Sequence, residues 1–215
     1  MQIAIALFEQ FTALDAIGPY AVLGGLRGAE ITFVAAARGP VHDDCALTVE
    51  ATAAFDEVTR PDVLVVPGGL ITRRMARDGH PVIDWIRAVH PTTTWTTSVC
   101  TGAVLLGAAG VLQGLDATTH WLAYDQLADL GAKPTSQRVV EAGKVITAAG
   151  VSSGIDMALT LVDRIAGSFV AQAVQLGIEY DPQPPFDAGS PAKAPREVYE
   201  ALAKSMKAAE AATLT

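Results

Sequence analysis

Short apolar runs that alternate with helical patterns are the feature of this sequence that most constrains its fold. The runs Ile3–Phe8 and Asp62–Pro67 are almost continuously apolar, which is typical of strands buried on both faces of a sheet. Ile31–Ala36 and the β-branched run Thr94–Val99 are expected to be further strands. Because helical patterns separate these runs, the sequence predicts an α/β fold, with an open and mostly parallel sheet covered by helices on both faces.

The other segments add helices and edge structure to this plan. Apolar residues recur at helical spacing in Tyr20–Leu26, Val82–Val89, Thr101–Ala109, Trp121 to about Leu130, and from Ile155 onward. Weak alternation predicts antiparallel edge structure over Pro40–Phe55, and Ala117–Thr119 is expected to be a short strand. The two-residue turn Ala142-Gly143 predicts a hairpin of Arg138–Glu141 with Lys144–Ala148. Ser153–Asp156 has the form of a capping box at the start of a helix.

The length of 215 residues fits one domain, and we expect residues 1–215 to form it. The stretch Asp181–Pro195 contains five prolines and no periodicity, which indicates a surface excursion. Pro195 is a favourable first residue for a last helix, expected to run from about residue 195 to about residue 211.

Charge and cysteine content exclude several kinds of partner. Asp and Glu outnumber Lys and Arg by 23 to 15, and no basic cluster interrupts this balance, which argues against nucleic acid and anionic membranes. Two cysteines cannot form a disulfide framework, so a reducing compartment, the cytoplasm, is expected. The N-terminus lacks the basic segment of a secretory signal, and no apolar stretch approaches the roughly 18 residues that span a bilayer.

Cys100 is the strongest candidate for chemistry. It lies between a predicted strand and a predicted helix, where a sharp turn would present its sulfur at the carboxyl edge of the sheet. The helix N-terminus would favour the thiolate and lower the thiol pKa. The alternative is a buried structural cysteine, which is the expected role of Cys45.

Other candidates cluster near the same sheet edge. The backbone N–H groups of Gly68-Gly69 and of Thr101 are candidates to donate to a developing negative charge, although a plain glycine turn is the alternative. Asp15 is either a helix N-cap or a carboxyl group that exchanges protons with the thiol. His120 is either a base for Cys100 or a structural histidine. No metal-ligand spacing and no phosphate-binding loop is found in the sequence, so no metal and no cofactor are expected.

Six stretches of the sequence together resemble the ThiJ/PfpI branch of the class I glutamine amidotransferase-like superfamily. The resemblance runs from about Ile3 to Pro195, nearly the whole chain, and the six stretches that carry it are Leu14–Pro19, Val63–Gly69, Thr97–Gly102, Gly107–Gly114, Ala117–Trp121 and Tyr180–Pro191. The resemblance implies a flavodoxin-like fold with a nucleophile elbow and a homodimeric assembly.

The resemblance also implies roles for individual residues. Cys100 becomes the nucleophile and Asp15 its carboxyl partner. Backbone donors and pocket walls fall at Thr101, Gly69, Gly150 and Val151. Two departures from relatives in this family narrow the expected activity. Thr101 stands where protease-like members have His. The shorter Asp15 stands where glyoxalase and protein-repair members have Glu.

These departures favour the isocyanide hydratase subgroup of the family. The implied reaction is the cofactor-free hydration of an organic isocyanide, a small molecule, to an N-substituted formamide through a covalent thioimidate on Cys100. Two alternatives stay open, a non-catalytic sensor of a small ligand and a glyoxalase or redox-responsive enzyme. Sensor relatives usually continue for about another hundred residues into a helix-turn-helix module, whereas this chain ends at Thr215, which favours the enzyme.

Overall fold

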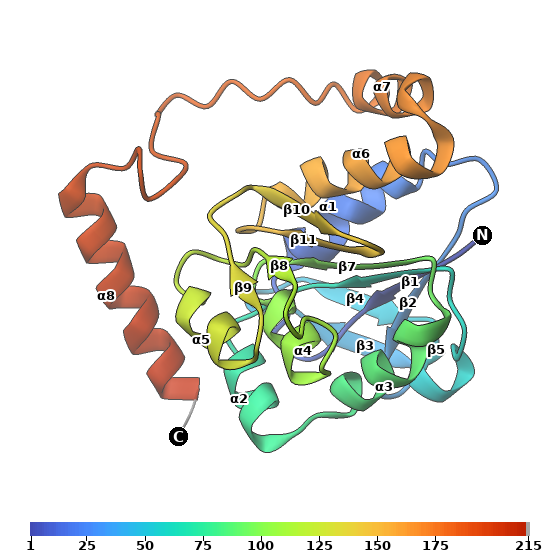
Figure 1. The fold of residues 1–215 in the computed structure, drawn as a ribbon, viewed down its shortest axis with the longest axis horizontal. Coiled ribbons are helices and arrows are strands. Elements are labelled where there is room, and N and C mark those ends of the chain that lie inside the picture. Colours follow the sequence, from blue (N-terminus) through green and yellow to red (C-terminus); the bar gives the residue numbers. More distant parts are fainter. Residues whose placement is uncertain (214–215) are drawn as a thin grey trace.

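A computed structural model of the chain, which describes residues 1–213, is built around one seven-stranded sheet (Figure 1). All neighbouring strands in it are parallel except the β10–β11 hairpin. In spatial order the strands are β10 (Val139–Ala142), β11 (Val145–Ala148), β7 (Trp95–Val99), β6 (Val63–Val66), β1 (Gln2–Ala6), β2 (Glu30–Ala35) and β5 (Ala53–Ala54). The predicted open, mostly parallel sheet and the predicted hairpin are therefore confirmed.

Helices cover both faces of this sheet (Figure 1). One face carries α1 (Ala13–Leu23) and α6 (Ser153–Ala166), which pack against each other, with α7 (Ser168–Gly177) outside α6. The opposite face carries α2 (Thr72–Asp78), α3 (Pro81–Val89) and α4 (Gly102–Ala108), and α5 (Tyr124–Asp129) lies beside α4. The sequence patterns did not indicate α2 or α7.

The core lies on the two faces of the central strands. All four residues of β6 are fully buried, as are Ile3 and Ile5 of β1. Such strands fit only a sheet with helices on both sides, which explains their continuous apolar runs. Buried apolar residues of α4 and α6 complete the core, among them Leu105 and Leu161.

Two predicted helix starts are wrong. The helix expected from Tyr20 begins at Ala13 and passes through Pro19. A proline inside a helix removes one backbone hydrogen bond, and the packing of α1 against α6 maintains the helix despite this loss. The residues expected to form a capping box do not cap α6, because Ser153 is already helical and its Oγ donates to the Gly150 carbonyl at 3.0 Å.

Short strands outside the main sheet form two small pairs. β3 (Gly39–His42) pairs with β4 (Thr48–Ala51) in antiparallel fashion, which confirms the prediction for this part of Pro40–Phe55, whereas β5 in the same range pairs in parallel with β2. The strand expected at Ala117–Thr119 is only β8 (Asp116–Ala117), and it pairs with β9 (Lys133–Pro134) away from the central sheet. Two 3₁₀ turns, Phe55–Glu57 and His90–Thr92, complete the elements before the C-terminal region.

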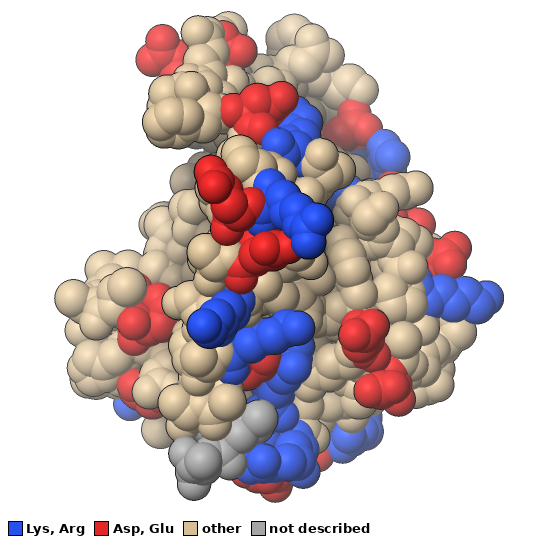
Figure 2. Space-filling view, turned by 90° about the vertical axis from the view of Figure 1, so that its left-hand side faces the viewer, with Lys and Arg blue, Asp and Glu red and all other residues tan. Residues whose placement is uncertain are grey.

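The last part of the described chain leaves the sheet. Residues 181–195 form an extended and mostly exposed connection to α8 (Arg196–Thr213), which lies beside α5 and α2 (Figure 1). On the side of the molecule that carries α8, Lys and Arg side chains lie among Asp and Glu side chains (Figure 2). Among residues 1–213, no helix combines the length and the apolar character needed to cross a membrane.

Candidate active site

Cys100 occupies a sharp turn between β7 and α4. Its φ of 57° lies in the left-handed region, which is strained for a side chain other than glycine. Neighbouring groups hold this conformation: the Cys100 N–H donates to the Ala149 carbonyl at 2.8 Å, and its carbonyl accepts from the Thr119 hydroxyl at 2.9 Å. A Cβ on Gly102 would collide with the Val66 carbonyl oxygen, so only glycine lets the chain turn here. The local geometry is that of a nucleophile elbow.

Asp15 lies beneath this turn, in the first turn of α1, and is fully buried. The helix N-cap position is Thr12, so the interpretation of Asp15 as an N-cap is wrong. Its Oδ2 accepts the Gly68 N–H at 2.8 Å, and its Oδ1 has no hydrogen-bond partner among the described residues. A Cβ on Gly68 would come within 2.9 Å of Oδ2, so the glycine makes room for the carboxyl group.

Burial makes Asp15 an acid of intermediate strength. It raises the pKa of the carboxyl group from its ordinary 3.8 to about 7, and the Gly68 N–H and the Cys100 thiol oppose this rise. Asp44 adds a small further increase through its charge. A carboxyl group with this pKa can both accept and release a proton near neutral pH.

The thiol of Cys100 is held in its neutral form. Burial raises its pKa above the ordinary range, and the charge of Asp15 raises it further. The N–H groups of Val151 and Thr101 and the Thr101 hydroxyl act in the opposite direction but do not overcome burial. The expectation of a lowered thiol pKa is therefore wrong for the resting site, because that argument considered the helix N-terminus without the desolvation of the sulfur.

The predicted backbone donors need a similar correction. The Gly68 N–H is taken by Asp15, and the Gly69 N–H donates to the Thr101 hydroxyl at 3.0 Å. The N–H groups that interact with the sulfur are those of Thr101 and Val151. Charge developing near the sulfur would thus meet the N–H groups of Thr101 and Val151 rather than those of the glycine pair.

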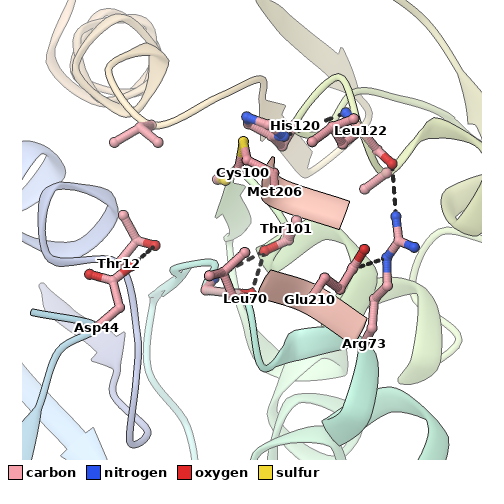
Figure 3. Close-up of a pocket in the computed structure, with 13 residues that line it drawn as sticks. Thr12, Asp44, Leu70, Arg73, Cys100, Thr101, His120, Leu122, Met206 and Glu210 are labelled. Carbon is pink, nitrogen blue, oxygen red and sulfur yellow. Dashed lines mark hydrogen bonds and ion pairs between the residues drawn. The ribbon is translucent and has the colours of Figure 1, made fainter. Parts of the chain in front are cut away.

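A cavity of about 240 Å³ opens above the sulfur of Cys100 (Figure 3). Gly69, Thr101 and Val151 line it, as the resemblance implied, and His120 lines it as well. Gly150 instead lines a neighbouring cavity of about 350 Å³ that shares His120 and Val151. The remaining lining residues are Thr12, Asp44, Leu70, Arg73, Leu122, Ala123, Met206 and Glu210. The sequence patterns did not indicate these eight residues, because they come from separate segments with no local signal of their own.

His120 lies near Cys100 in the wall of this cavity (Figure 3). Its Nδ1 accepts the Leu122 N–H at 3.4 Å, which leaves the proton of the neutral ring on Nε2. Burial lowers the pKa of His120, so the ring is neutral near pH 7. A Cβ on Gly150 would come within 3.0 Å of Cδ2, so this glycine leaves space for the ring.

Cys45 is in a different environment from Cys100. The expectation of a buried structural cysteine is wrong for Cys45, because it is exposed and lies in an acidic turn with Asp44 and Asp43, whose charges raise its pKa. These three side chains lie within 4.8 Å of one another, but Asp43 Oδ1 already accepts the N–H groups of Cys45 and Leu47. Such a thiol is a poor nucleophile at neutral pH.

The sequence of this chain is similar to those of several known proteins. The chain is similar to an isonitrile hydratase from Pseudomonas putida, with 43% identity over 204 residues that cover 95% of this chain and 89% of the relative. It is also 29% identical over 138 residues to the HTH-type transcriptional regulator CdhR of Pseudomonas aeruginosa, a match that covers 63% of this chain and 40% of the regulator.

Solved structures and a family model extend the comparison. A ThiJ/PfpI family protein from Pseudomonas syringae superimposes with a TM-score of 0.92 and 36% identity, covering 99% of this chain and 88% of that one. Drosophila melanogaster DJ-1beta shares the fold with a TM-score of 0.75 at 22% identity, over 84% of this chain and 98% of that one. The model of the DJ-1/PfpI family matches residues 1–164. The chain belongs to the DJ-1/PfpI family.

Proposed function

We propose that this protein hydrates isonitriles (isocyanides, R–N≡C) to N-substituted formamides, with Cys100 as nucleophile and Asp15 as acid and base. The observation that carries the proposal is the buried Asp15–Cys100 pair at the base of a mainly apolar cavity. The similarity to the isonitrile hydratase, over most of both chains, supports the same substrate class.

The first step uses the single proton that the pair holds near neutral pH. The Asp15 carboxylate accepts the proton of the Cys100 thiol while the sulfur bonds to the terminal carbon of the isonitrile. Asp15 then passes this proton to the same carbon. The product is a thioimidate, R–N=CH–S–Cys100, and Asp15 is again a carboxylate.

The second step consumes water. The Asp15 carboxylate accepts a proton from water as the oxygen bonds to the thioimidate carbon, and it passes this proton to the nitrogen to give R–NH–CH(OH)–S–Cys100. The C–S bond then breaks, the hydroxyl proton returns to the sulfur through Asp15, and R–NH–CHO is released. The sum is one isonitrile and one water converted to one formamide.

Three groups near the pair assist in this scheme. The N–H groups of Thr101 and Val151 stabilise the sulfur as it gains negative character. The Nε2–H group of the neutral His120 is proposed to donate a hydrogen bond to the substrate nitrogen, since this ring lines the same cavity.

The direct test is the conversion of an aromatic isonitrile by the purified wild-type protein. Formamide is detected by NMR of the formyl proton, with protein alkylated at Cys100 as the control. Formation of formamide at the same rate by native and alkylated protein would contradict the proposal.

The pH dependence of this reaction follows from the pair. Because the pair must hold one proton, and its first proton leaves with a pKa of about 7, kcat/KM is expected to rise as the pH increases through about 7 and then to level off. We expect kcat/KM to decline only at strongly alkaline pH, where the Cys100 thiol ionises as well. Initial rates measured between pH 5 and 9 check this prediction, and a profile that is flat across pH 7 would contradict it.

The assembly is proposed to be a homodimer formed through the face that carries α1, α6 and α7. None of the residues of α7 is buried, and Phe169 and Leu176 are 86% and 78% exposed. Apolar exposure of this kind on one helix is typical of an interaction surface. Light scattering is expected to give twice the chain mass of 22.4 kDa, and Phe169→Asp with Leu176→Asp is expected to give monomers. A wild-type mass of one chain would contradict the dimer.

The proposed location is the cytoplasm. Both cysteines are free, and the covalent mechanism requires Cys100 in its reduced form. A reducing compartment maintains that form.

A further inference from the structure

Helix α8 forms one wall of the cavity above Cys100. Ala203, Met206 and Glu210 are its half-buried residues along the part that borders the cavity, and together with Tyr199 they follow a spacing of four, three and four residues. This spacing places them on one face of the helix. The Tyr199 ring packs against Trp121 with ring centroids 5.0 Å apart, which fixes the N-terminal half of α8 on the protein.

A second attachment lies further along α8, where Glu210 and Arg73 line the cavity. The Glu210 carboxylate forms an ion pair with Arg73 of α2, and Arg73 Nη2 also donates to the Leu122 carbonyl at 2.7 Å. The Glu210 side chain is only 17% exposed, and burial raises its pKa while Arg73 opposes this rise. Arg73 and Glu210 therefore join α8 to α2 and to the loop before α5.

Met206 extends from α8 into the cavity between these two attachments (Figure 3). Leu70, Leu122, Ala123 and Val151 provide most of the other apolar lining. The charges of Arg73 and Glu210 are paired with each other, so this side of the cavity offers an apolar surface rather than a site for an ionic group.

We propose that Met206 is a specificity-determining residue that limits the size of the group attached to the isonitrile, and that Arg73 and Glu210 are positioning residues that hold it there. This inference rests on the proposed function. An isonitrile is linear at its nitrogen, so when its carbon meets the sulfur of Cys100 its substituent must extend away from the sulfur across the cavity. The walls on that side decide which substituents fit.

The first experiment compares kcat/KM for cyclohexyl isocyanide with kcat/KM for the longer biphenylyl isocyanide. Met206→Ala is expected to shift this ratio toward the biphenylyl substrate by about tenfold or more, because each methylene of fit is worth roughly 10–200-fold in discrimination. Met206→Leu, which keeps the volume, and Lys204→Ala, on the exposed face of α8, are the matched controls and are expected to retain the wild-type ratio. Glu210→Gln is expected to shift the ratio in the direction of Met206→Ala, since it removes the ion pair but preserves the side-chain shape.

The second experiment needs no turnover. In a Cys45→Ala background, the rate of Cys100 alkylation is measured with iodoacetamide and with a bulky aryl maleimide. Met206→Ala and Glu210→Gln are expected to raise the maleimide rate relative to the iodoacetamide rate, and Lys204→Ala is not.

The outcomes separate this inference from the proposed function. A wild-type protein that hydrates neither isonitrile would overturn the proposed function, and the alkylation ratios would then decide whether Met206 selects by size. An active wild type whose substrate ratio and alkylation ratio are both unchanged by Met206→Ala would overturn the inference and leave the function intact.

Discussion

Cys100→Ala is expected to abolish isonitrile hydration while the protein remains folded. Without the sulfur no thioimidate forms, and loss of a nucleophile typically costs on the order of 10⁴-fold or more in rate. Alanine occupies less space than cysteine and places the same backbone demand on the strained turn, where φ is 57°. Formamide production by NMR and a thermal melt of the same sample measure the two parts of this result.

Cys45→Ala is the matched control. This cysteine is exposed and lies in the turn that contains Asp43 and Asp44, so its removal is expected to leave the rate within about twofold of wild type, as for most surface substitutions. Substantial hydration by Cys100→Ala would refute a covalent mechanism, and a large loss in Cys45→Ala would show that the assignment of the nucleophile is mistaken.

Asp15→Asn is expected to reduce the rate of isonitrile hydration at least roughly a hundredfold, since loss of a general acid–base group typically costs ~10²–10⁴-fold. The amide keeps an oxygen that can accept the Gly68 N–H but cannot exchange a proton with the thiol. Steady-state kinetics at pH 7 and 8 provide the test. If Asp15→Asn retained nearly the full rate, the proton transfers proposed for Asp15 would have to be assigned to another group.

The same variant is expected to be more stable than the wild type at pH 8. The folded pKa of Asp15, about 7, lies above the ordinary 3.8, so between these values the unfolded chain has released a proton that the folded protein retains. Stability therefore falls as the pH rises through this window, by up to about 4 kcal/mol at pH 8 from roughly 1.4 kcal/mol per pKa unit. Urea unfolding is measured at pH 4 and pH 8. The free energies of unfolding of the two proteins should be nearly equal at pH 4, and that of Asp15→Asn should be larger at pH 8.

Asp15→Glu separates the hydratase from the glyoxalase alternative. It keeps an acid but moves it by one methylene, so isonitrile hydration is expected to fall, though less than in Asp15→Asn. Methylglyoxal is tested beside the isonitrile with both proteins. Turnover of methylglyoxal but not of the isonitrile by the wild type would favour the glyoxalase.

The parts of the fold that the sequence predicts are those controlled by local patterns. Continuous apolar runs identify β1, β6 and the other buried strands because their burial on both faces leaves few positions for polar residues. Helix α7 lacks such a signal, because none of its residues is buried and only Val170, Ala171 and Val174 pack against the edge of the core. The start of α1 was misplaced because a proline is normally a helix boundary, whereas tertiary packing here carries the helix through Pro19.

The site was predictable to the extent that it depends on the strand–turn–helix at Cys100. The neighbours of the sulfur come from segments distant in sequence, and only the folded chain shows that Asp15 lies beneath it with an unpaired oxygen. The thiol pKa was mispredicted because desolvation depends on everything that surrounds the sulfur. The cavity is also lined by Arg73, Met206 and Glu210. These residues belong to helices that carry no motif, so no sequence pattern indicates that they line the cavity.

The exposed connection at residues 181–195 has a consequence for how substrate range evolves in this protein. It separates α8 from the sheet, so a substitution on the inner face of α8 alters the cavity without disturbing the packing that holds Cys100 and Asp15. Natural selection can therefore change which substituent is accepted while the chemistry at the elbow stays constant.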